Sequence, residues 1–245
     1  MKIRHVFLAA LCLLPLPIAA QAPSIITMDQ EPHHHLVMEN GLFKIFNVVV
    51  APGDAIVLHR HDHDTVAIAI GDQEVTVGVP GKPDVHQKNL DGQVRLQPGG
   101  YMHSTHVDGA EPYHTVAVEL LLAQTGARNL CAAVMSGQPL NCPEVSAKSV
   151  PASYSESPMF ESDQTLIRLV RVFPHQDAAV GDMQLIIALD PGFISPAHKG
   201  DPELTMRPGD YVWLDKAGTD RKFENKSGKE SRFIELSFER RVPGK

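Results

Sequence analysis

Alternating apolar and polar residues run from Leu42 to Leu122, and the pattern resumes at Leu166 and continues to Phe238. Turn dipeptides interrupt the first stretch at short intervals. They are Pro52-Gly53, Gly71-Asp72, Pro80-Gly81, Asp91-Gly92 and Asp108-Gly109. A period of two residues bounded by such turns predicts short antiparallel β-strands rather than helices. The chain is therefore predicted to be all-β.

Residues 126–160 separate the two patterned stretches. They lose the alternation and collect Gly, Pro, Ser and Asn, a composition that is typical of a linker. We therefore predict two β domains, residues 30–125 and 161–243, rather than one large domain.

The first 22 residues have the features of a secretory signal peptide. Lys2 and Arg4 give a basic start, an apolar core follows, and small residues end the segment at Ala19, Ala20 and Ala22. The apolar run is too short for a membrane span, and no stop-transfer segment follows it. We expect residues 1–22 to be removed and the mature chain to be secreted or periplasmic, without a membrane as partner.

Net charge and cysteine content indicate the kinds of partner and the redox compartment. The net charge of -7 becomes -9 when Lys2 and Arg4 leave with the signal peptide, and an acidic balance argues against nucleic acid as a partner. Of the three cysteines, only Cys131 and Cys142 remain in the mature chain. An even pair in an oxidising compartment predicts a disulfide within the linker. The alternative is a catalytic or metal-ligating thiol.

Two histidine-bearing segments carry the candidate chemistry. In the strand that ends G-D-A-I-V-L-H-R-H, alternate side chains face the same way, so His59 and His61 can converge on one ion. His103 must arrive from a neighbouring strand, aimed by the bend at Pro98-Gly99-Gly100. Three neutral imidazoles suit one divalent transition metal, Fe, Zn, Mn, Cu or Ni, and leave positions open for a small-molecule ligand or substrate.

The segments Gly53–His61 and Gly92–His103 together resemble the two signature motifs of the cupin superfamily, G-x5-H-x-H and G-x5-P-x-G-x2-H. The first domain is most similar to the conserved-barrel type. The resemblance implies two β-barrels of the double-stranded β-helix or jelly-roll type, with the metal in the first. It covers residues 30–125 well and residues 161–243 weakly.

The second half resembles a truncated and degenerate copy of the first. Within residues 217–228, Arg221 stands where the ligand histidine would be. The segment Pro191–His198 is similar to Pro52–His59, with Gly200 in place of the second histidine. The two motifs lie so close together that we expect the hairpin between them to be deleted.

The first domain departs from four-ligand cupins at Thr65, where a glutamate is expected. The three-histidine set is similar to branches of the superfamily that dispense with this carboxylate, the diketone-cleaving and cysteine-dioxygenase-like ones. Asp64 has the opposite strand parity and should point away, whereas His63 and Thr65 are expected beside the metal ligands. Tyr101 is the candidate catalytic acid or hydrogen-bond donor, with simple packing as the alternative. The tract His33-His34-His35 is interpreted as a polar approach to a strand, with adventitious metal binding as the alternative.

The sequence thus favours an exported bicupin that acts as a small-molecule metalloenzyme with dioxygenase-like oxidoreductase chemistry. The alternative is a non-catalytic cupin that binds a ligand or a metal and uses its second barrel for packing or for a homodimer. The sequence does not decide between an enzyme and a binding protein, because a fold does not fix a function.

Overall fold

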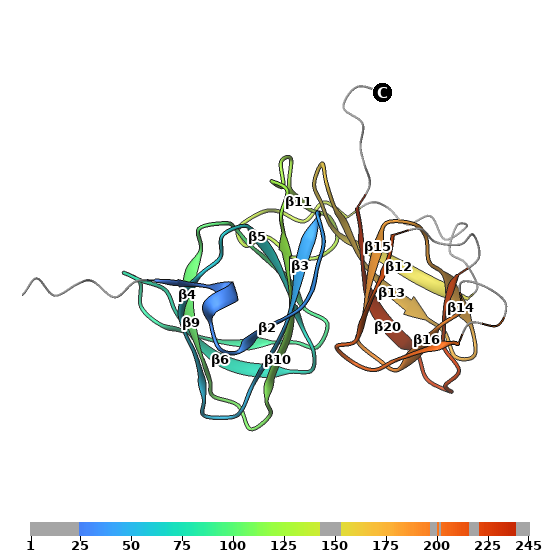
Figure 1. The fold of residues 1–245 in the computed structure, drawn as a ribbon, viewed down its shortest axis with the longest axis horizontal. Helices are drawn as coiled ribbons and strands as arrows, with labels where there is room; N and C mark the ends of the chain where they lie inside the picture. The colour runs from blue at the N-terminus through green and yellow to red at the C-terminus, as the bar shows by residue number, and fades with distance from the viewer. Residues whose placement is uncertain (1–24, 143–152, 197–199, 201, 216–220, 239–245) are drawn as a thin grey trace, which may run out of the picture.

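The computed structural model describes residues 25–142, 153–196, 200, 202–215 and 221–238, in which the chain forms two β-barrels side by side (Figure 1). Apart from one 3-10 helix, η1 (Met28–Gln30), the regular structure of these residues is all β-strand, as predicted. No helix in this part of the chain has the length and apolarity needed to cross a membrane. The expected signal peptide, residues 1–22, lies outside the described residues.

The first barrel consists of two packed sheets with the strand orders β1-β4-β9-β6-β7 and β2-β3-β10-β5-β8. Its strands are β1 (Ile26–Thr27), β2 (His34–Glu39), β3 (Phe43–Val50), β4 (Ala55–Arg60), β5 (Asp64–Ala69), β6 (Gln73–Gly78), β7 (Val85–Asn89), β8 (Val94–Gln97), β9 (Met102–Val107) and β10 (Tyr113–Leu120). The turns fall where the sequence predicts them. Gly53, Gly71 and Gly92 each have a positive φ, which a residue with a side chain adopts only at a cost.

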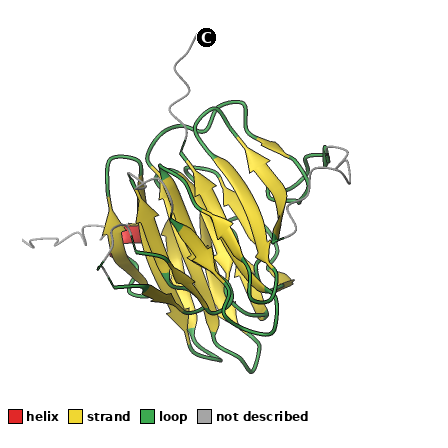
Figure 2. Ribbon diagram, turned by 90° about the vertical axis from the view of Figure 1, so that its right-hand side faces the viewer, coloured by secondary structure: helices red, strands yellow, loops and turns green. Residues whose placement is uncertain are grey.

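The second barrel is also built from two sheets, with the orders β11-β12-β13-β20-β15-β18 and β14-β19-β16-β17. Its strands are β11 (Arg128–Asn129), β12 (Tyr154–Glu161), β13 (Leu166–Val172), β14 (Asp177–Ala179), β15 (Gln184–Ala188), β16 (Gly192–Ile194), β17 (Leu204–Met206), β18 (Tyr211–Leu214), β19 (Lys222–Glu224) and β20 (Ser231–Ser237). Figure 2 looks onto this barrel and shows its strands in packed layers.

The second barrel repeats the first strand for strand, because β14-β19-β16-β17 corresponds to β4-β9-β6-β7 and β12-β13-β20-β15-β18 to β2-β3-β10-β5-β8. The prediction of a deleted hairpin is therefore wrong. The hairpin is present as β16 and β17, shortened to 3 residues each. Pro191 and Gly192 lead into the counterpart of β6 rather than of β4, so Gly200 does not stand in for His61. The resemblance misleads because a Pro-Gly turn can precede any strand of a barrel.

The strand register supports the prediction that Arg221 stands at the position of a ligand histidine. His59 on β4 pairs with His103 on β9. At the matching place in the second barrel, the backbone N–H of Val180 donates to the carbonyl oxygen of Arg221 at 3.0 Å. Arg221 therefore takes the place of His103, and the buried Val180 takes the place of His59.

One apolar core joins the two barrels. The faces of β5 and β10 that point away from the first barrel's interior pack on β15 and β20 of the second. This inter-barrel core contains Val66, Ile68, Val116, Val118, Leu185, Ile187, Ile234 and Leu236, all at most 1% exposed. At its rim, Arg232 donates to Asp91 of the first barrel and Asp190 of the second, both at 2.6 Å. The barrels are therefore expected to unfold as one unit.

The expected linker, residues 126–160, contains strands. β11 and β12 belong to the second barrel's sheet, and β12 begins at Tyr154. The sequence does not predict β12, because Pro158 breaks the strand pattern. In the structure Pro158 lies at a β-bulge, where a sheet tolerates proline. Between the strands, a loop is held by the buried Asn129, whose side chain donates to the carbonyl oxygens of Met135 and Gln138.

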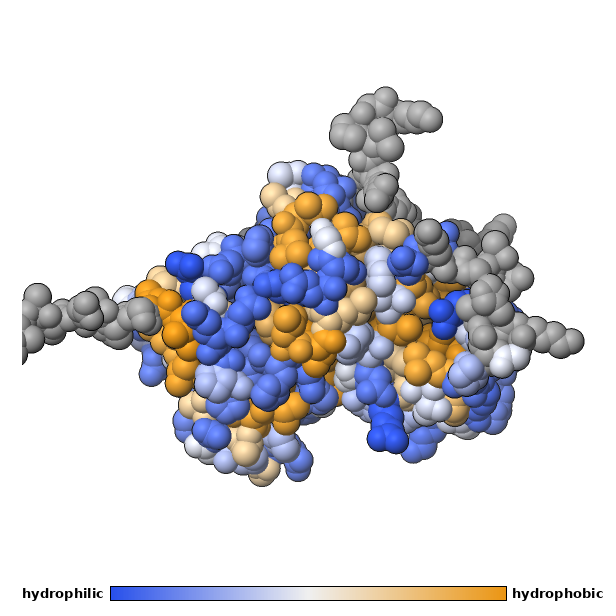
Figure 3. Space-filling model, viewed as in Figure 1, coloured by the Kyte–Doolittle hydropathy of each residue, from blue (hydrophilic) through white to orange (hydrophobic). Residues whose placement is uncertain are grey.

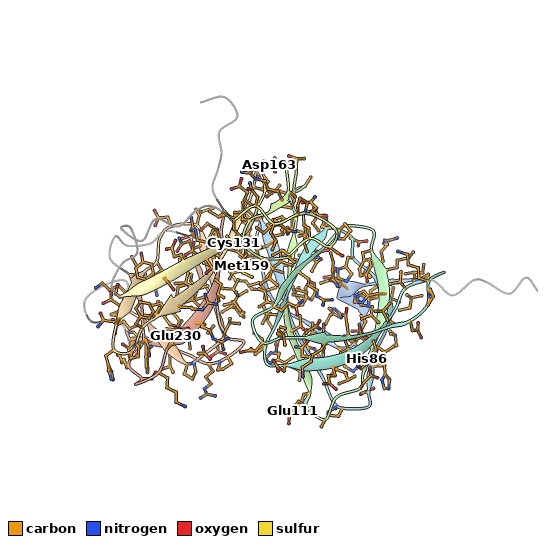
Figure 4. The ribbon with its side chains drawn as sticks, turned by 180° about the vertical axis from the view of Figure 1, so that it is seen from behind. His86, Glu111, Cys131, Met159, Asp163 and Glu230 are labelled. Atoms are coloured by element: carbon orange, nitrogen blue, oxygen red, sulfur yellow. The ribbon has the colours of Figure 1, made fainter. Side chains whose placement is uncertain are left out.

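Both cysteines are free thiols in the structure, so the expected disulfide is not formed there. Cys131 lies at the junction of the barrels, next to Met159 (Figure 4). A hydrogen bond with Cys142, together with partial burial, raises the pKa of the Cys131 thiol to about 11. The two sulfur atoms are thus neighbours at the base of the loop, and the disulfide stays a prediction.

Apolar side chains reach the surface in separate patches among polar ones on the face shown in Figure 3. Large exposed apolar side chains occur at scattered places such as Leu36, Val85, Leu140 and Leu204. Scattered apolar residues are normal on a soluble protein and do not mark a docking surface. The expected homodimer therefore stays a prediction.

Candidate metal centre

His59, His61 and His103 converge inside the first barrel, at the positions that the sequence predicts. Their ring centroids lie 4.6 to 5.1 Å apart, and one nitrogen of each ring lies within 4.8 Å of the other two. In the described part of the chain, this is the only group of His, Cys, Asp or Glu side chains close enough to hold one metal ion. His61 follows the end of β4, where its backbone N–H donates to the carbonyl oxygen of Tyr101 at 2.9 Å.

A β-bulge in β4 orients the first of these rings. The register shifts between Ile56 and His59, so that Val57 and Leu58 are both exposed while His59 is buried. The bulge also brings the carbonyl oxygen of Val57 to 2.9 Å from Nδ1 of His59. When Nδ1 donates its proton there, Nε2 keeps its lone pair and faces the other two histidines. Simple alternation does not predict this bulge.

The ring nitrogens fit a bound cation. Nε2 of His61 and Nε2 of His103 approach to 3.0 Å, and Nδ1 of His103 lies 3.3 Å from the hydroxyl of Thr105. Nε2 of His59 is buried without any hydrogen-bond partner. A buried nitrogen that makes no hydrogen bond costs about 1–3 kcal/mol, and a shared metal ion would remove that cost. Three imidazoles therefore suit a transition metal ion.

Burial keeps the three imidazoles neutral. Desolvation, followed by repulsion from neighbouring histidines, lowers the pKa of His59 to about 4 and that of His61 to about 3. The same causes place the pKa of His103 well below its usual value. Only a neutral imidazole has a lone pair to give to a metal, so the rings are ready to bind one at neutral pH.

We expect the metal-free protein to lose stability in mild acid. Below pH 6.5 the unfolded chain takes up protons at His59 and His61, which the folded chain accepts only near pH 4 and below. The free energy of unfolding should therefore fall as pH is lowered from 6.5 to 4, by roughly 3 kcal/mol for His59 alone. Urea titrations across this range measure the slope. The variant His61→Leu should show a shallower slope, and a flat profile in the unchanged protein would contradict neutral burial.

Glu31 and His34 border the metal centre. His34 belongs to the histidine tract noted in the sequence, whereas no pattern in the sequence singles out Glu31. The Glu31 carboxylate is buried and lies 2.7 Å from Nδ1 of His34 and 3.2 Å from Nδ1 of His33. Burial alone would raise the pKa of Glu31, but hydrogen bonds from the two histidines outweigh it and lower the pKa to about 2. The His34 ring lies 4.7 Å from the ring of His59. Of the histidine tract, His34 thus reaches the site, from the first position of β2.

His63 and Thr65, the residues expected beside the ligands, lie outside the metal-ligand group. Thr65 is fully buried, and its hydroxyl donates to the carbonyl oxygen of His63 at 3.2 Å. The half-exposed His63 is 3.1 Å from the buried carboxylate of Glu119, which lies opposite Thr65 on β10. Asp64 accepts the backbone N–H of Gly99 at 2.9 Å and so caps the turn before Tyr101. Neither Asp64 nor Thr65 belongs to the metal-ligand group.

A cavity of about 660 Å³ opens beside His103. Tyr101 lines it, with its ring stacked on the His103 ring at 4.9 Å. Desolvation raises the pKa of Tyr101, so its hydroxyl stays protonated and can donate a hydrogen bond at neutral pH. The small side chains of Ala67 and Ala69 leave room on the facing strand, and residues 133–138 of the loop form part of the wall. The volume suits a small organic molecule.

Among known proteins, this chain resembles solved structures in its fold but matches none of the families or curated proteins in sequence. No protein-family model matches the sequence, and no curated protein matches it either. Solved structures do match. AerE from Microcystis aeruginosa has a TM-score of 0.54 at 11% identity and covers 85% of this chain and 98% of its own. Salicylate 1,2-dioxygenase from Pseudaminobacter salicylatoxidans has a TM-score of 0.55 at 10% identity, with 84% and 77% covered. A cupin 2 conserved barrel domain protein from Leptotrichia buccalis has a TM-score of 0.52 at 8% identity, with 83% and 87% covered.

The chain has the cupin fold. The predicted fold class, two cupin-type barrels, is thereby confirmed, because the matches cover both barrels. At these identities the similarity concerns the fold, and the chemistry of the site has to be argued from this chain's own residues.

Among the residues that the structure describes, small side chains in the first barrel correspond to bulky ones in the second. The strand registers relate Ala67, Thr105 and Thr115 to Ile186, Phe223 and Phe233 of the second barrel. The bulky residues fill the second interior, together with Val172, Ile194 and Met206. Gly192 has no side chain, and a Cβ there would lie 2.1 Å from the Phe223 ring. The second barrel is therefore a packed module, and the cavity belongs to the barrel with the histidines.

Proposed function

We propose that this cupin binds one divalent transition metal through His59, His61 and His103 and acts as a small-molecule metalloenzyme with dioxygenase-like oxidoreductase chemistry. The observation that carries the proposal is the meeting of three neutral imidazoles, one of which, His103, lines a cavity of about 660 Å³. A structural neighbour, salicylate 1,2-dioxygenase, carries this type of activity in its name, and structures of two of its mutants hold gentisate.

Each residue of the site has a separate task in the proposal. The carbonyl oxygen of Val57 and the hydroxyl of Thr105 orient two of the rings. A metal ion with three imidazole ligands keeps coordination positions open and would supply Lewis acidity or redox chemistry, depending on its identity. Tyr101 would donate a hydrogen bond to a substrate in the cavity, and Ala67 leaves the volume that the substrate needs.

Oxygen uptake tests the proposed activity. The mature chain, residues 23–245, would be loaded separately with Fe, Zn, Mn, Cu or Ni and offered gentisate, salicylate, a β-diketone or a thiol. We expect oxygen consumption with at least one pair of metal and substrate, and none with the metal-free protein or with His103→Gln. A metal-loaded protein that binds these compounds and consumes no oxygen would contradict the enzyme and favour the non-catalytic cupin.

Export is part of the same proposal and rests on the signal-peptide features of residues 1–22. In the native cells, the protein should be recovered from the periplasm or the medium with a new N-terminus near Pro23. Recovery from the cytosol with Met1 in place would contradict it.

In that compartment Cys131 and Cys142 should be joined by a disulfide. The thiols are neighbours, and the bond would close a loop of about 11 residues and add roughly 2–3 kcal/mol of stability. Mass analysis of unreduced protein should show a linked peptide pair, and two alkylatable thiols would contradict it. Because residues 133–138 line the cavity, reduction should loosen the cavity wall while metal content stays unchanged. Cys142→Ser should reproduce the effect of reduction.

A further inference from the structure

The cavity of the first barrel is lined by apolar and polar side chains, and its only full charge is positive. Its polar lining consists mainly of amide and hydroxyl side chains, among them Gln87, Asn89 and Tyr101. Among the residues that the structure describes, no Asp, Glu or Lys lines the cavity, and Arg95 is the one arginine there. A positive cavity contrasts with a chain whose net charge is -7, so the overall charge does not account for it.

Arg95 has spare hydrogen-bonding capacity. Its guanidinium donates to the Oε1 atom of Gln87 at 2.6 Å, an interaction that joins β8 of one sheet to β7 of the other. Within the described residues, no carboxylate lies within ion-pair distance of Arg95. A guanidinium carries five N–H donors in a planar fork, so most of them remain available inside the cavity.

The fold does not require a charge at this place. Arg95 on β8 pairs with Ala67 of β5, and the corresponding residue on β18 is Val212, which pairs with Ile186 of β15. The two barrels have the same strand order, yet only the hollow one carries an arginine here. Placing an unpaired charge in a partly buried site costs desolvation energy, so a stabilising partner is expected.

We propose that Arg95 binds the carboxylate of a small organic anion, whose other end reaches the metal centre at His103. The inference rests on the proposed function only for the second end of the ligand. A planar fork of donors matches a carboxylate with two parallel hydrogen bonds, and such charge-assisted pairs are about twice as strong as neutral ones. Asn89 offers a further contact, because its buried Oδ1 accepts no hydrogen bond and can take one from a ligand hydroxyl.

The test compares benzoate with benzamide, two probes of similar shape that differ in charge. Both would be titrated by calorimetry into metal-loaded and metal-free mature protein. We expect benzoate to bind at least about tenfold more tightly than benzamide in both forms. Arg95→Gln should remove this preference, and Arg95→Lys should retain part of it. Arg128→Gln is the matched control, because Arg128 is exposed, pairs with Glu161 and lies outside the cavity.

Two outcomes would overturn the inference: an unchanged preference for benzoate in Arg95→Gln, or no preference in the unchanged protein. The fluorescence of the single tryptophan, Trp213, in the second barrel reports whether the variant is folded. If the protein binds no metal but keeps an Arg95-dependent preference, the proposed function fails and this inference stands. If it binds metal and consumes oxygen without that preference, only this inference fails.

Discussion

Replacing His103 by alanine should lower the affinity for a transition metal by well over 100-fold, since even residues that only orient a ligand change affinity by about 10- to 100-fold. His103 is 6% exposed, and its Nε2 lies 3.0 Å from that of His61. Alanine removes one of three donors, and no other described His, Cys, Asp or Glu is close enough to replace it. Competition with a chromophoric chelator measures the affinity, and elemental analysis measures the metal retained after dialysis.

His106→Ala is the matched control, because His106 lies on the same strand as His103, is exposed and contacts Asp108 at 2.8 Å. This variant should bind metal as tightly as the unchanged protein. Tight binding in His103→Ala would show that the metal is held elsewhere.

Replacing Phe43 by alanine should destabilise the whole molecule by about 3–5 kcal/mol. Phe43 is fully buried, and its ring lies 5.1 Å from that of Trp213 and 5.0 Å from that of Phe238, both in the second barrel. The variant leaves a cavity in the inter-barrel core. Chemical denaturation followed by Trp213 fluorescence measures the loss, and circular dichroism should report the same single transition.

Val49→Ala is the control for this prediction, because Val49 lies on the same strand and is 45% exposed. Its cost should stay within about 0.5 kcal/mol. A loss below about 1 kcal/mol in Phe43→Ala, or two separate unfolding transitions, would contradict a shared core.

The alternation of residues and the spacing of the motifs predict most of the first barrel. Turns such as Pro52-Gly53 and Asp91-Gly92 delimit strands because their conformations are local, and motif spacing brings His103 to His59 and His61. The bulge before His59 depends on the pairing of β4 with β9, which no local pattern encodes. The same holds for Glu31, which is buried only because the N-terminal segment folds back over the barrel.

In the second barrel, short strands make the alignment with the first barrel ambiguous. Its hairpin β16–β17 has only 3 residues per strand, too few for a visible alternation, so the Pro191-Gly192 turn becomes aligned with the wrong strand. Arg221 is placed correctly because the residues around it keep the turn chemistry of the motif. The filling of the interior by Phe223 and Phe233 could not be read in advance, because it depends on which strands face each other across the barrel.

The most direct test of the account is the metal content of the mature chain, combined with X-ray absorption at the edge of the metal that is found. The account predicts one equivalent of a divalent transition metal per chain, with three imidazole nitrogens in its first shell at about 2.0–2.1 Å if the metal is zinc. Two equivalents, none after loading, or a first shell built from carboxylate or sulfur ligands would contradict it.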